Sequence, residues 1–506
     1  MKHFKEMLRE KYNRSVFKFR GLWIFCGFFL LYIFLGLCLS YYEAYDTNMF
    51  FGADNYRAYD DLANIIGIFN HYRIAVHPLF LLLGQTMTLL VDGAVNRLTM
   101  SILLVEACCG ALSVSLFDAI LGRKKTEGRI RTIFALIYGF SFSSMIFSTV
   151  PETFIFACLG LVSYWYFLSV AAEAVGPLSR REWILLVFFG VVSCGVTLTN
   201  YIFYLVGLVY LLSQRYRSRV GVKVFCGLNA LNVIATTAAC MYQKFVWRQA
   251  PLFWTSVFNS IFSGANYEEV LYMNADFSLQ KISEWLIQTV CAPLLPAGVY
   301  LHDPGQPYHP ILFLKYSEPI MAVLLVFWIL LAVCLLVWLV GLRRRLETNH
   351  GGYILALLAA YAGNLALHYI YGSTEAFMYS PHYLFYILLA VPLALEQSGC
   401  QGLKRIIVPS MVVFLSVEVV NNILRYVQTI NLGLSTIDST LCLPHAVIGT
   451  VLCGGLLLLA LYGWERLTRN WPATWGENLA EQRIYAAVRA YCILASAVSL
   501  FIAFNY

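Results

Sequence analysis

Apolar runs of about 20 residues, nearly free of charge, recur along the whole chain. A helix of that length crosses the roughly 30 Å hydrocarbon core of a bilayer, whereas strands and the helices of soluble domains are shorter. The runs predict thirteen membrane-spanning helices, at residues 21–42, 98–121, 130–149, 152–173, 183–199, 201–213, 222–241, 320–341, 352–371, 381–397, 405–424, 444–463 and 486–504. The predicted fold is an all-α, multi-pass membrane protein.

Composition and charge agree with this prediction. Hydrophobic residues make up 60% of the chain and charged residues 12%, which excludes an ordinary soluble protein, where about 25% of residues are charged. Most of the 35 basic residues fall in the N-terminal tail and in alternate loops, which the positive-inside rule assigns to the cytoplasm. The net charge of +7 therefore lies beside the membrane lipids and does not predict a nucleic-acid partner.

This topology leaves two long segments outside the membrane, residues 43–97 and 242–319. Within the first segment, LFLLLGQTMTLLV (79–91) is apolar but too short to cross, and crossing would invert every later loop. We expect it to lie on the outer surface as an interfacial helix. No internal repeat interrupts the pattern, so residues 1–506 are interpreted as one integrated transmembrane domain.

The fourteen cysteines do not change this picture. Most of them lie inside apolar runs, and none shows the Cys-x-x-Cys or Cys/His spacing of a metal site. They are interpreted as small buried hydrophobic residues, and the sequence predicts no metal centre from them.

The polar residues of the first outer segment stand out from this background. The stretch FGADNYRAYDDLANIIGIFNHYRIAVHPLF (51–80) holds Asp54, Arg57, Asp60, Asp61 and His77. One interpretation is a solvated loop with ordinary surface charge. The apolar run ANIIGIF, however, predicts that the loop lies against the membrane, and helical spacing brings its acids near one face. A guanidinium favours the ionised form of a neighbouring carboxylate, which is the form a general base needs.

Several motifs then match a known family in order along the chain. They are ADNYR after the first span, VHPLFLLL, TVPETFIFACLGL at the start of the fourth span, and SPHYLFYILLAVPLAL. Together they resemble the polyprenyl-phosphate-dependent glycosyltransferases of the GT-C superfamily, such as the lipid A aminoarabinose transferases and the protein O-mannosyltransferases. The resemblance covers residues 20–215 best and the remainder only by its architecture.

The resemblance implies a site on the outer face, with a first-loop catalytic acid at Asp54 and a second outer acid at Glu152. The residues expected around the donor phosphate and the substrate are Arg57, His77, Arg248, His382, Tyr383, Asp60 and Asp61. Two positions depart from the family pattern. Asn55 follows Asp54 where several members have a second acid, and His382-Tyr383 stands where many have Arg-Tyr.

The implied reaction is transfer of a sugar from a polyprenyl-phosphate donor to an acceptor that is a glycan, a lipid or a protein. No Gly-rich nucleotide motif is present, as expected for a lipid-linked donor. A divalent metal ion held by Asp54 and Glu152, as in some relatives, is left open. The alternatives are a transporter or flippase of lipid-linked sugars, and a glycan polymerase or ligase that uses a lipid-diphosphate donor. Glu106 and Glu418 lie inside predicted spans, where a buried acid either carries function or is satisfied by hydrogen bonds.

Overall fold

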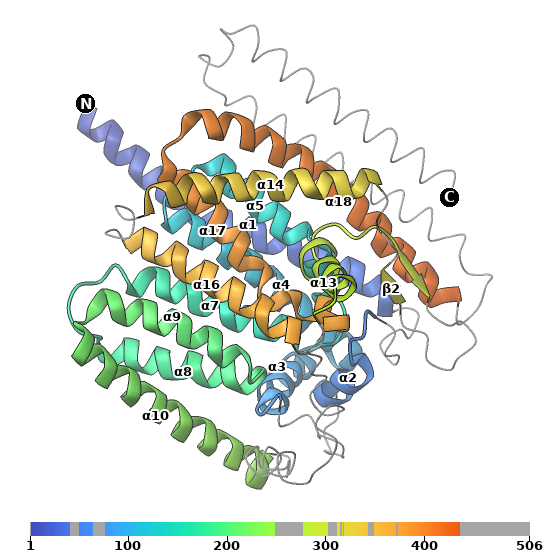
Figure 1. The fold of residues 1–506 in the computed structure, drawn as a ribbon. Helices are drawn as coiled ribbons and strands as arrows, with labels where there is room; N and C mark the ends of the chain where they lie inside the picture. Colours follow the sequence, from blue (N-terminus) through green and yellow to red (C-terminus); the bar gives the residue numbers. More distant parts are fainter. Residues whose placement is uncertain are drawn as a thin grey trace, which may run out of the picture.

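The computed structural model describes residues 2–40, 50–63, 76–247, 277–301, 311–313, 316, 318–342, 349–370 and 373–435. The spans expected at 444–463 and 486–504 lie outside these residues, as do much of the two outer segments and the candidate residue Arg248. The described residues are almost entirely helical (Figure 1).

The longer helices follow the order of the predicted spans. They are α1 (Lys2–Ser40), α4 (Leu98–Arg123), α5 (Gly128–Phe140), α7 (Phe154–Ala171), α8 (Arg180–Val196), α9 (Asn200–Arg215), α10 (Ser218–Tyr242), α14 (Glu318–Val340), α16 (Asn349–Ile370), α17 (Leu384–Ser398) and α18 (Gln401–Ser435). The shorter elements are α2 (Asn55–Ala63), α3 (Phe80–Val95), α6 (Phe142–Phe147), α13 (Leu279–Leu286), the π-helices η3 (Gln243–Trp247) and η4 (Ile287–Cys291), the 3₁₀-helix η5 (Ser373–His382), and the antiparallel strands β1 (Val299–Leu301) and β2 (Ile311–Phe313).

Seven of the described helices are long and apolar enough to cross a membrane, or eight if a pair of helices bent by 51° at Tyr383 is counted as one span. The chain is therefore an integral, multi-pass membrane protein. The predicted total of thirteen spans is not reached within the described residues. The expected spans at 183–199 and 201–213 coincide with α8 and α9, which have 17 and 16 residues and fall short of the usual spanning length.

The prediction of one continuous span over residues 130–149 is wrong. Helix α5 ends at Phe140, and Ser141 adopts an extended backbone before α6 begins at Phe142. The Ser141 side chain accepts a hydrogen bond from the Ser144 backbone N–H at 3.2 Å, as an N-cap serine does. The apolar pattern did not show the break because the residues on both sides of Ser141 are hydrophobic.

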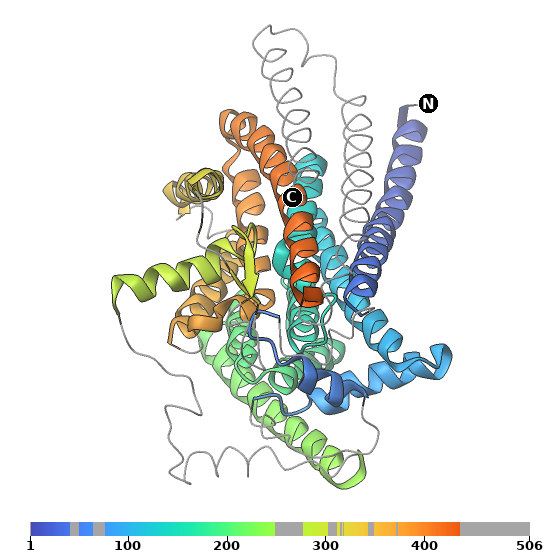
Figure 2. The same ribbon diagram turned by 90° about the vertical axis from the view of Figure 1, so that its right-hand side faces the viewer.

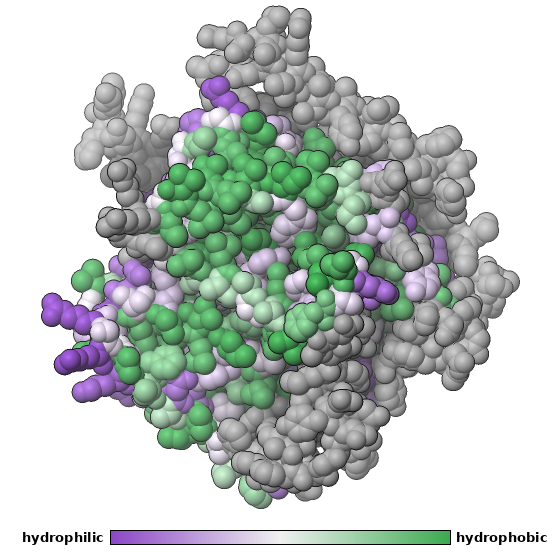
Figure 3. Space-filling model, viewed as in Figure 1, coloured by the Kyte–Doolittle hydropathy of each residue, from purple (hydrophilic) through white to green (hydrophobic). Residues whose placement is uncertain are grey.

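Helices α4 and α7 form the centre of the molecule. Their most apolar stretches are 67% and 72% buried, compared with 22% for α10 and α14. Helix α4 packs against α1, α3, α5 and α7. Figure 3 shows a broad hydrophobic surface in the middle of the molecule. Leu325, Val326 and Ile329 on α14 are exposed. Lipid chains would cover such a surface in a bilayer.

The two outer segments meet at one end of the bundle, called here the outer end, where α2, α3, α13 and β2 lie (Figures 1 and 2). The Phe51 backbone N–H donates to the Ile311 carbonyl at 3.2 Å. The Phe51 ring stacks on Phe313 at 4.6 Å and meets Phe142 and Phe377 edge-on at 5.6 and 5.2 Å between centroids. Aromatic packing therefore joins the first segment to the second, which the sequence analysis treated as separate.

The opposite end, called the cytoplasmic end, holds a buried ion network. Asp118 on α4 is fully buried and accepts hydrogen bonds from Arg20 Nη2 at 2.8 Å and from Arg131 Nε at 2.8 Å. The sequence places Arg131 in a basic cytoplasmic turn, yet its side chain is only 5% exposed. A single aspartate thus ties α1, α4 and α5 together.

We predict that Asp118→Ala lowers the unfolding free energy by about 3–5 kcal/mol, because it removes one partner of a buried ion pair. The control is Arg123→Ala, which breaks the Arg123–Glu173 pair, whose side chains are 36% and 37% exposed, and leaves Glu173 paired with Lys124. Exposed pairs contribute less than about 1 kcal/mol. Thermal unfolding of the purified proteins measures both effects, and equal losses for the two variants would contradict the account.

Candidate active site

A tight turn brings Asp54 to the start of α2. Phe51 and Gly52 have positive φ angles of 55° and 80°, and the Ala53 N–H donates to the Phe50 carbonyl at 2.9 Å. Glycine adopts such a conformation without a steric penalty. The Asp54 carbonyl then accepts the Ala58 N–H at 2.9 Å, so α2 begins here. A carboxylate at this end of a helix is favoured by the helix dipole.

Arg57 is the centre of the site. Its Nε lies 3.5 Å from Asp54 Oδ2, its Nη1 lies 3.0 Å from Asp61 Oδ2, and its Nη2 lies 3.8 Å from Glu152 Oε2. The Arg57 side chain is 14% exposed and that of Glu152 only 2%. One guanidinium therefore faces three carboxylates from two separate parts of the chain. We call these four residues the Arg57 cluster.

The turn between α6 and α7 holds Glu152 in place. The Glu152 N–H donates to Glu106 Oε1 on α4 at 3.1 Å, and the Thr153 N–H donates to Glu152 Oε2 at 2.8 Å. Asn55, the first residue of α2, donates from Nδ2 to the Pro151 carbonyl at 3.0 Å and is fully buried. These bonds connect α2, α4 and the start of α7 around Glu152.

Among the residues that the structure describes, acidic groups outnumber basic groups in the cluster, although Asp54, Asp61 and Glu152 also have interactions beyond those named above. Three carboxylates share one guanidinium, and a fourth carboxyl, Glu106, is buried on α4 next to Glu152. Within the part of the chain that the structure describes, Glu106 Oε2 has no hydrogen-bond partner. A buried group with spare acceptor capacity is costly in a membrane protein and marks a functional position. The arrangement is suited to accepting a proton or a positively charged group.

The described residues do not support a metal site. Among them, no group of three or more His, Cys, Asp or Glu side chains is arranged to hold a metal ion. Glu152 is already engaged by Arg57 and by the Thr153 N–H. No divalent ion is therefore assigned to Asp54 and Glu152.

His382 and Tyr383 lie at the corner between η5 and α17, and both are fully buried. The His382 ring lies 5.5 Å from the Phe154 ring, which follows Glu152 by two residues. Neither ring nitrogen of His382 has a hydrogen-bond partner among the described residues. The Tyr383 hydroxyl donates to the Ala376 carbonyl at 3.3 Å. His382 thus has free capacity to bind a ligand, whereas Tyr383 stabilises the corner.

The remaining candidates are His77, Asp60 and Arg248. His77 Nδ1 is 2.7 Å from the Val196 carbonyl, so His77 links the start of α3 to the turn between α8 and α9. Asp60 is exposed on α2, whereas Asp61 is buried. Arg248 is outside the described residues.

Two residues at the site were not among the predicted site residues. Glu106 gave a signal in the sequence, because an acid inside an apolar span is rare, but the sequence did not show that it contacts Glu152. Asn55 gave no positive signal and was noted only as a departure from the family pattern. Its role depends on the Pro151 carbonyl, which no sequence pattern reveals.

Comparison of the chain with models of known protein families and with curated proteins finds no match. The membership in a glycosyltransferase superfamily therefore stays a prediction.

We predict that Asn55→Ala lowers the unfolding free energy by about 1–3 kcal/mol, because the buried Pro151 carbonyl loses its donor. Asn55→Asp should cost more, since it places a carboxylate oxygen against that carbonyl. Thermal unfolding of both variants beside wild type provides the test. A fully stable Asn55→Asp protein would mean that the contact between α2 and Pro151 does not hold the site together.

Proposed function

We propose that the protein is a membrane glycosyltransferase of the GT-C type, which transfers a sugar from a polyprenyl-phosphate donor to an acceptor on the outer face of the membrane. The observation that carries the proposal is the Arg57 cluster. Asp54, Asp61 and Glu152 converge on one arginine at the outer end, and motifs containing Asp54 and Glu152 carry the family resemblance. The acceptor is a glycan, a lipid or a protein.

In this proposal Asp54 is the general base. It is the most accessible of the three carboxylates, at 19% side-chain exposure compared with 8% for Asp61 and 2% for Glu152. An acceptor hydroxyl oxygen forms a bond to the anomeric carbon of the sugar while the bond from that carbon to the phosphate oxygen breaks. The hydroxyl proton passes to Asp54, and polyprenyl phosphate leaves with the bonding electron pair. General-base catalysis of this kind contributes about 10²–10⁴-fold.

Arg57 has two roles in the proposal. It keeps Asp54 and Glu152 close together in spite of their like charges, and its positive charge stabilises negative charge that develops on the leaving phosphate. His382 is the second expected contact of the donor phosphate, because both of its buried ring nitrogens lack partners among the described residues. Its ring packs on Phe154, close in sequence to Glu152.

We predict that Asp54→Asn reduces consumption of the donor at least about 100-fold, because the amide cannot accept the proton. The matched control is Glu284→Gln, which removes an exposed acid from α13 at the same end of the molecule and should retain wild-type turnover. Mass spectrometry would follow the release of polyprenyl phosphate from a panel of polyprenyl-phosphate sugars. The purified protein would be held in lipid nanodiscs with an envelope extract as the source of acceptor.

Equal turnover by wild type and a folded Asp54→Asn protein would remove Asp54 from the reaction. Equal losses in Asp54→Asn and Glu284→Gln would indicate a general effect of charge on the outer surface, not a catalytic base.

A second candidate function is transport of lipid-linked sugars, which two observations favour. Glu418 lies in the middle of α18, is fully buried, and has neither carboxylate oxygen hydrogen-bonded among the described residues. Residues Ala376–His382 and Leu384–Ser398 form a helix pair bent by 51°. Buried acids and broken helices are features of transporter sites.

Transport and consumption of the lipid-linked sugar, each measured for wild type and Glu418→Gln, distinguish the two functions. A transporter would move a fluorescent lipid-linked sugar across proteoliposome membranes without consuming it, and Glu418→Gln would slow this movement. A glycosyltransferase would consume the donor, and Glu418→Gln would retain most of the turnover if it remains folded.

A further inference from the structure

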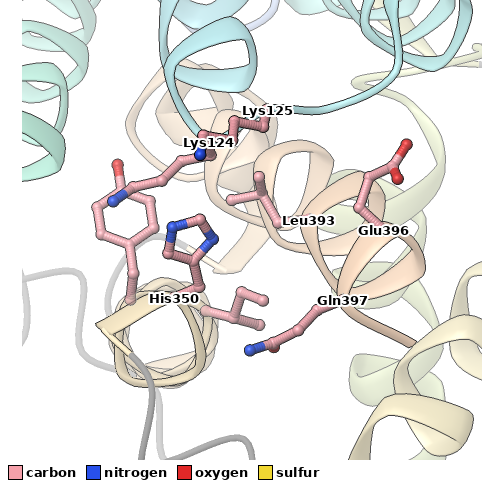
Figure 4. A pocket seen from close by; sticks show the side chains of 8 residues that line it. Lys124, Lys125, His350, Leu393, Glu396 and Gln397 are labelled. Atoms are coloured by element: carbon pink, nitrogen blue, oxygen red, sulfur yellow. The ribbon is translucent and has the colours of Figure 1, made fainter. Parts of the chain in front are cut away.

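A second polar site lies at the cytoplasmic end of the molecule, at the end of α4 far from the Arg57 cluster. A cavity of about 240 Å³ opens there between the α4–α5 turn, the start of α16 and the end of α17. Figure 4 shows Lys124 and Lys125 on one side of this cavity and His350 and Gln397 on the other, with Leu393 between them. The lining is cationic on one side and polar on the other, and it also includes the apolar residues Ile354 and Leu393.

Lys125 occupies a backbone position that usually belongs to glycine. The Lys125 N–H donates to the Gly122 carbonyl at 3.1 Å and the Thr126 N–H donates to the Leu121 carbonyl at 3.0 Å. This pair of bonds is the Schellman ending of α4, whose left-handed residue is most often glycine. Lys125 adopts this conformation with φ of 60°, which is unfavourable for a residue with a Cβ. A lysine at such a strained position supports the hypothesis that its side chain has a function.

The charge of Lys125 is not compensated by its neighbours. Lys124 Nζ pairs with Glu173 at 3.3 Å and lies 5.0 Å from the centroid of the Tyr353 ring. The Glu396 carboxylate pairs with Lys404 at 2.5 Å and accepts the Glu127 N–H at 2.9 Å, and in Figure 4 it points away from His350. The Lys125 side chain, in contrast, makes no ion pair or hydrogen bond with the residues that the structure describes. The cavity therefore has a net positive character.

We propose that this cavity binds the phosphate group of an anionic molecule on the cytoplasmic side, with Lys125 as its principal cation and His350 as a second polar contact. Anionic headgroups give a cytoplasmic leaflet a negative surface potential that attracts cationic groups, and basic pockets between helices bind such headgroups. The phosphate belongs either to a lipid headgroup or to a soluble phosphate. The proposal is independent of the reaction assigned to the outer end.

The test measures binding to the purified full-length protein by native mass spectrometry, with phosphatidic acid compared against phosphatidylcholine. The variants are Lys125→Gln and, as a matched control, Lys223→Gln, which removes an exposed lysine from the cytoplasmic side of α10. We expect wild type and Lys223→Gln to retain phosphatidic acid in preference to phosphatidylcholine. Lys125→Gln should weaken that binding about fivefold, the effect of one lysine near an anionic surface.

A second variant separates binding from folding. Lys125→Gly relieves the left-handed backbone, so it should bind phosphatidic acid as weakly as Lys125→Gln while its melting temperature stays equal to that of wild type or rises. Competition by inorganic phosphate distinguishes a lipid headgroup from a soluble phosphate as the bound group. If it displaces phosphatidic acid at millimolar concentration, the site accepts soluble phosphate, and if it does not, the site requires a lipid headgroup.

Two results would overturn the proposal. One is equal retention of phosphatidic acid by Lys125→Gln and Lys223→Gln. The other is the absence of any preference for phosphatidic acid over phosphatidylcholine in wild type, together with no change in melting temperature when inorganic phosphate is added.

Discussion

The guanidinium of Arg57 is the interaction on which the outer end of this protein depends. Asp61 and Glu152 are buried, and buried carboxylates are tolerated only when they are paired or protonated. Because Arg57 lies on α2 and Glu152 on the α6–α7 turn, their pairing requires a surface loop to pack onto the membrane domain. The break at Ser141 is part of the same arrangement. It ends α5 and begins α6, which contributes Phe142 to the aromatic cluster that fixes Phe51 at the start of the loop.

Each end of the molecule holds a network of ion pairs, and the two networks differ in which charge is shared. At the cytoplasmic end, two arginines, Arg20 and Arg131, share the single carboxylate of Asp118. At the outer end, three carboxylates share one arginine. Among the described residues, acids therefore predominate in the outer network and bases in the cytoplasmic network. Helix α4 connects both ends, because it carries Glu106 near its start and Asp118 near its end.

The apolar runs predicted the helices well, since burial in lipid demands long stretches without charge. The eleven expected spans that fall within the described residues each coincide with helical residues. The runs could not predict the break at Ser141, because a cap is a local hydrogen bond between residues that are as buried as their neighbours. The shortness of α8 and α9 was already visible in the sequence, because charged residues before 183 and after 213 confine the two predicted spans to 183–199 and 201–213.

For the candidate site, the sequence predicted contacts within α2 better than contacts between α2 and the rest of the chain. The spacing of Asp54, Arg57 and Asp61 placed them on one helical face, and the structure pairs them. The contact with Glu152 spans almost a hundred residues and depends on tertiary packing, so spacing alone could not show it. For His77 the predicted contact differs from the one in the structure. The resemblance implied a position near the donor phosphate, whereas its ring contacts the Val196 carbonyl.

The central claim is that Arg57 and Glu152 belong to one buried site, and a double-mutant cycle tests it most directly. The unfolding free energies of wild type, Arg57→Met, Glu152→Gln and the double variant would be measured under identical conditions. Residues in one ion-pair network show coupling energies of about 0.5–3 kcal/mol, whereas distant residues are additive. The account predicts a coupling in that range, with the double variant more stable than the sum of the single losses implies. Strict additivity of the two losses would contradict it, because it would mean that α2 and the start of α7 do not form a common site.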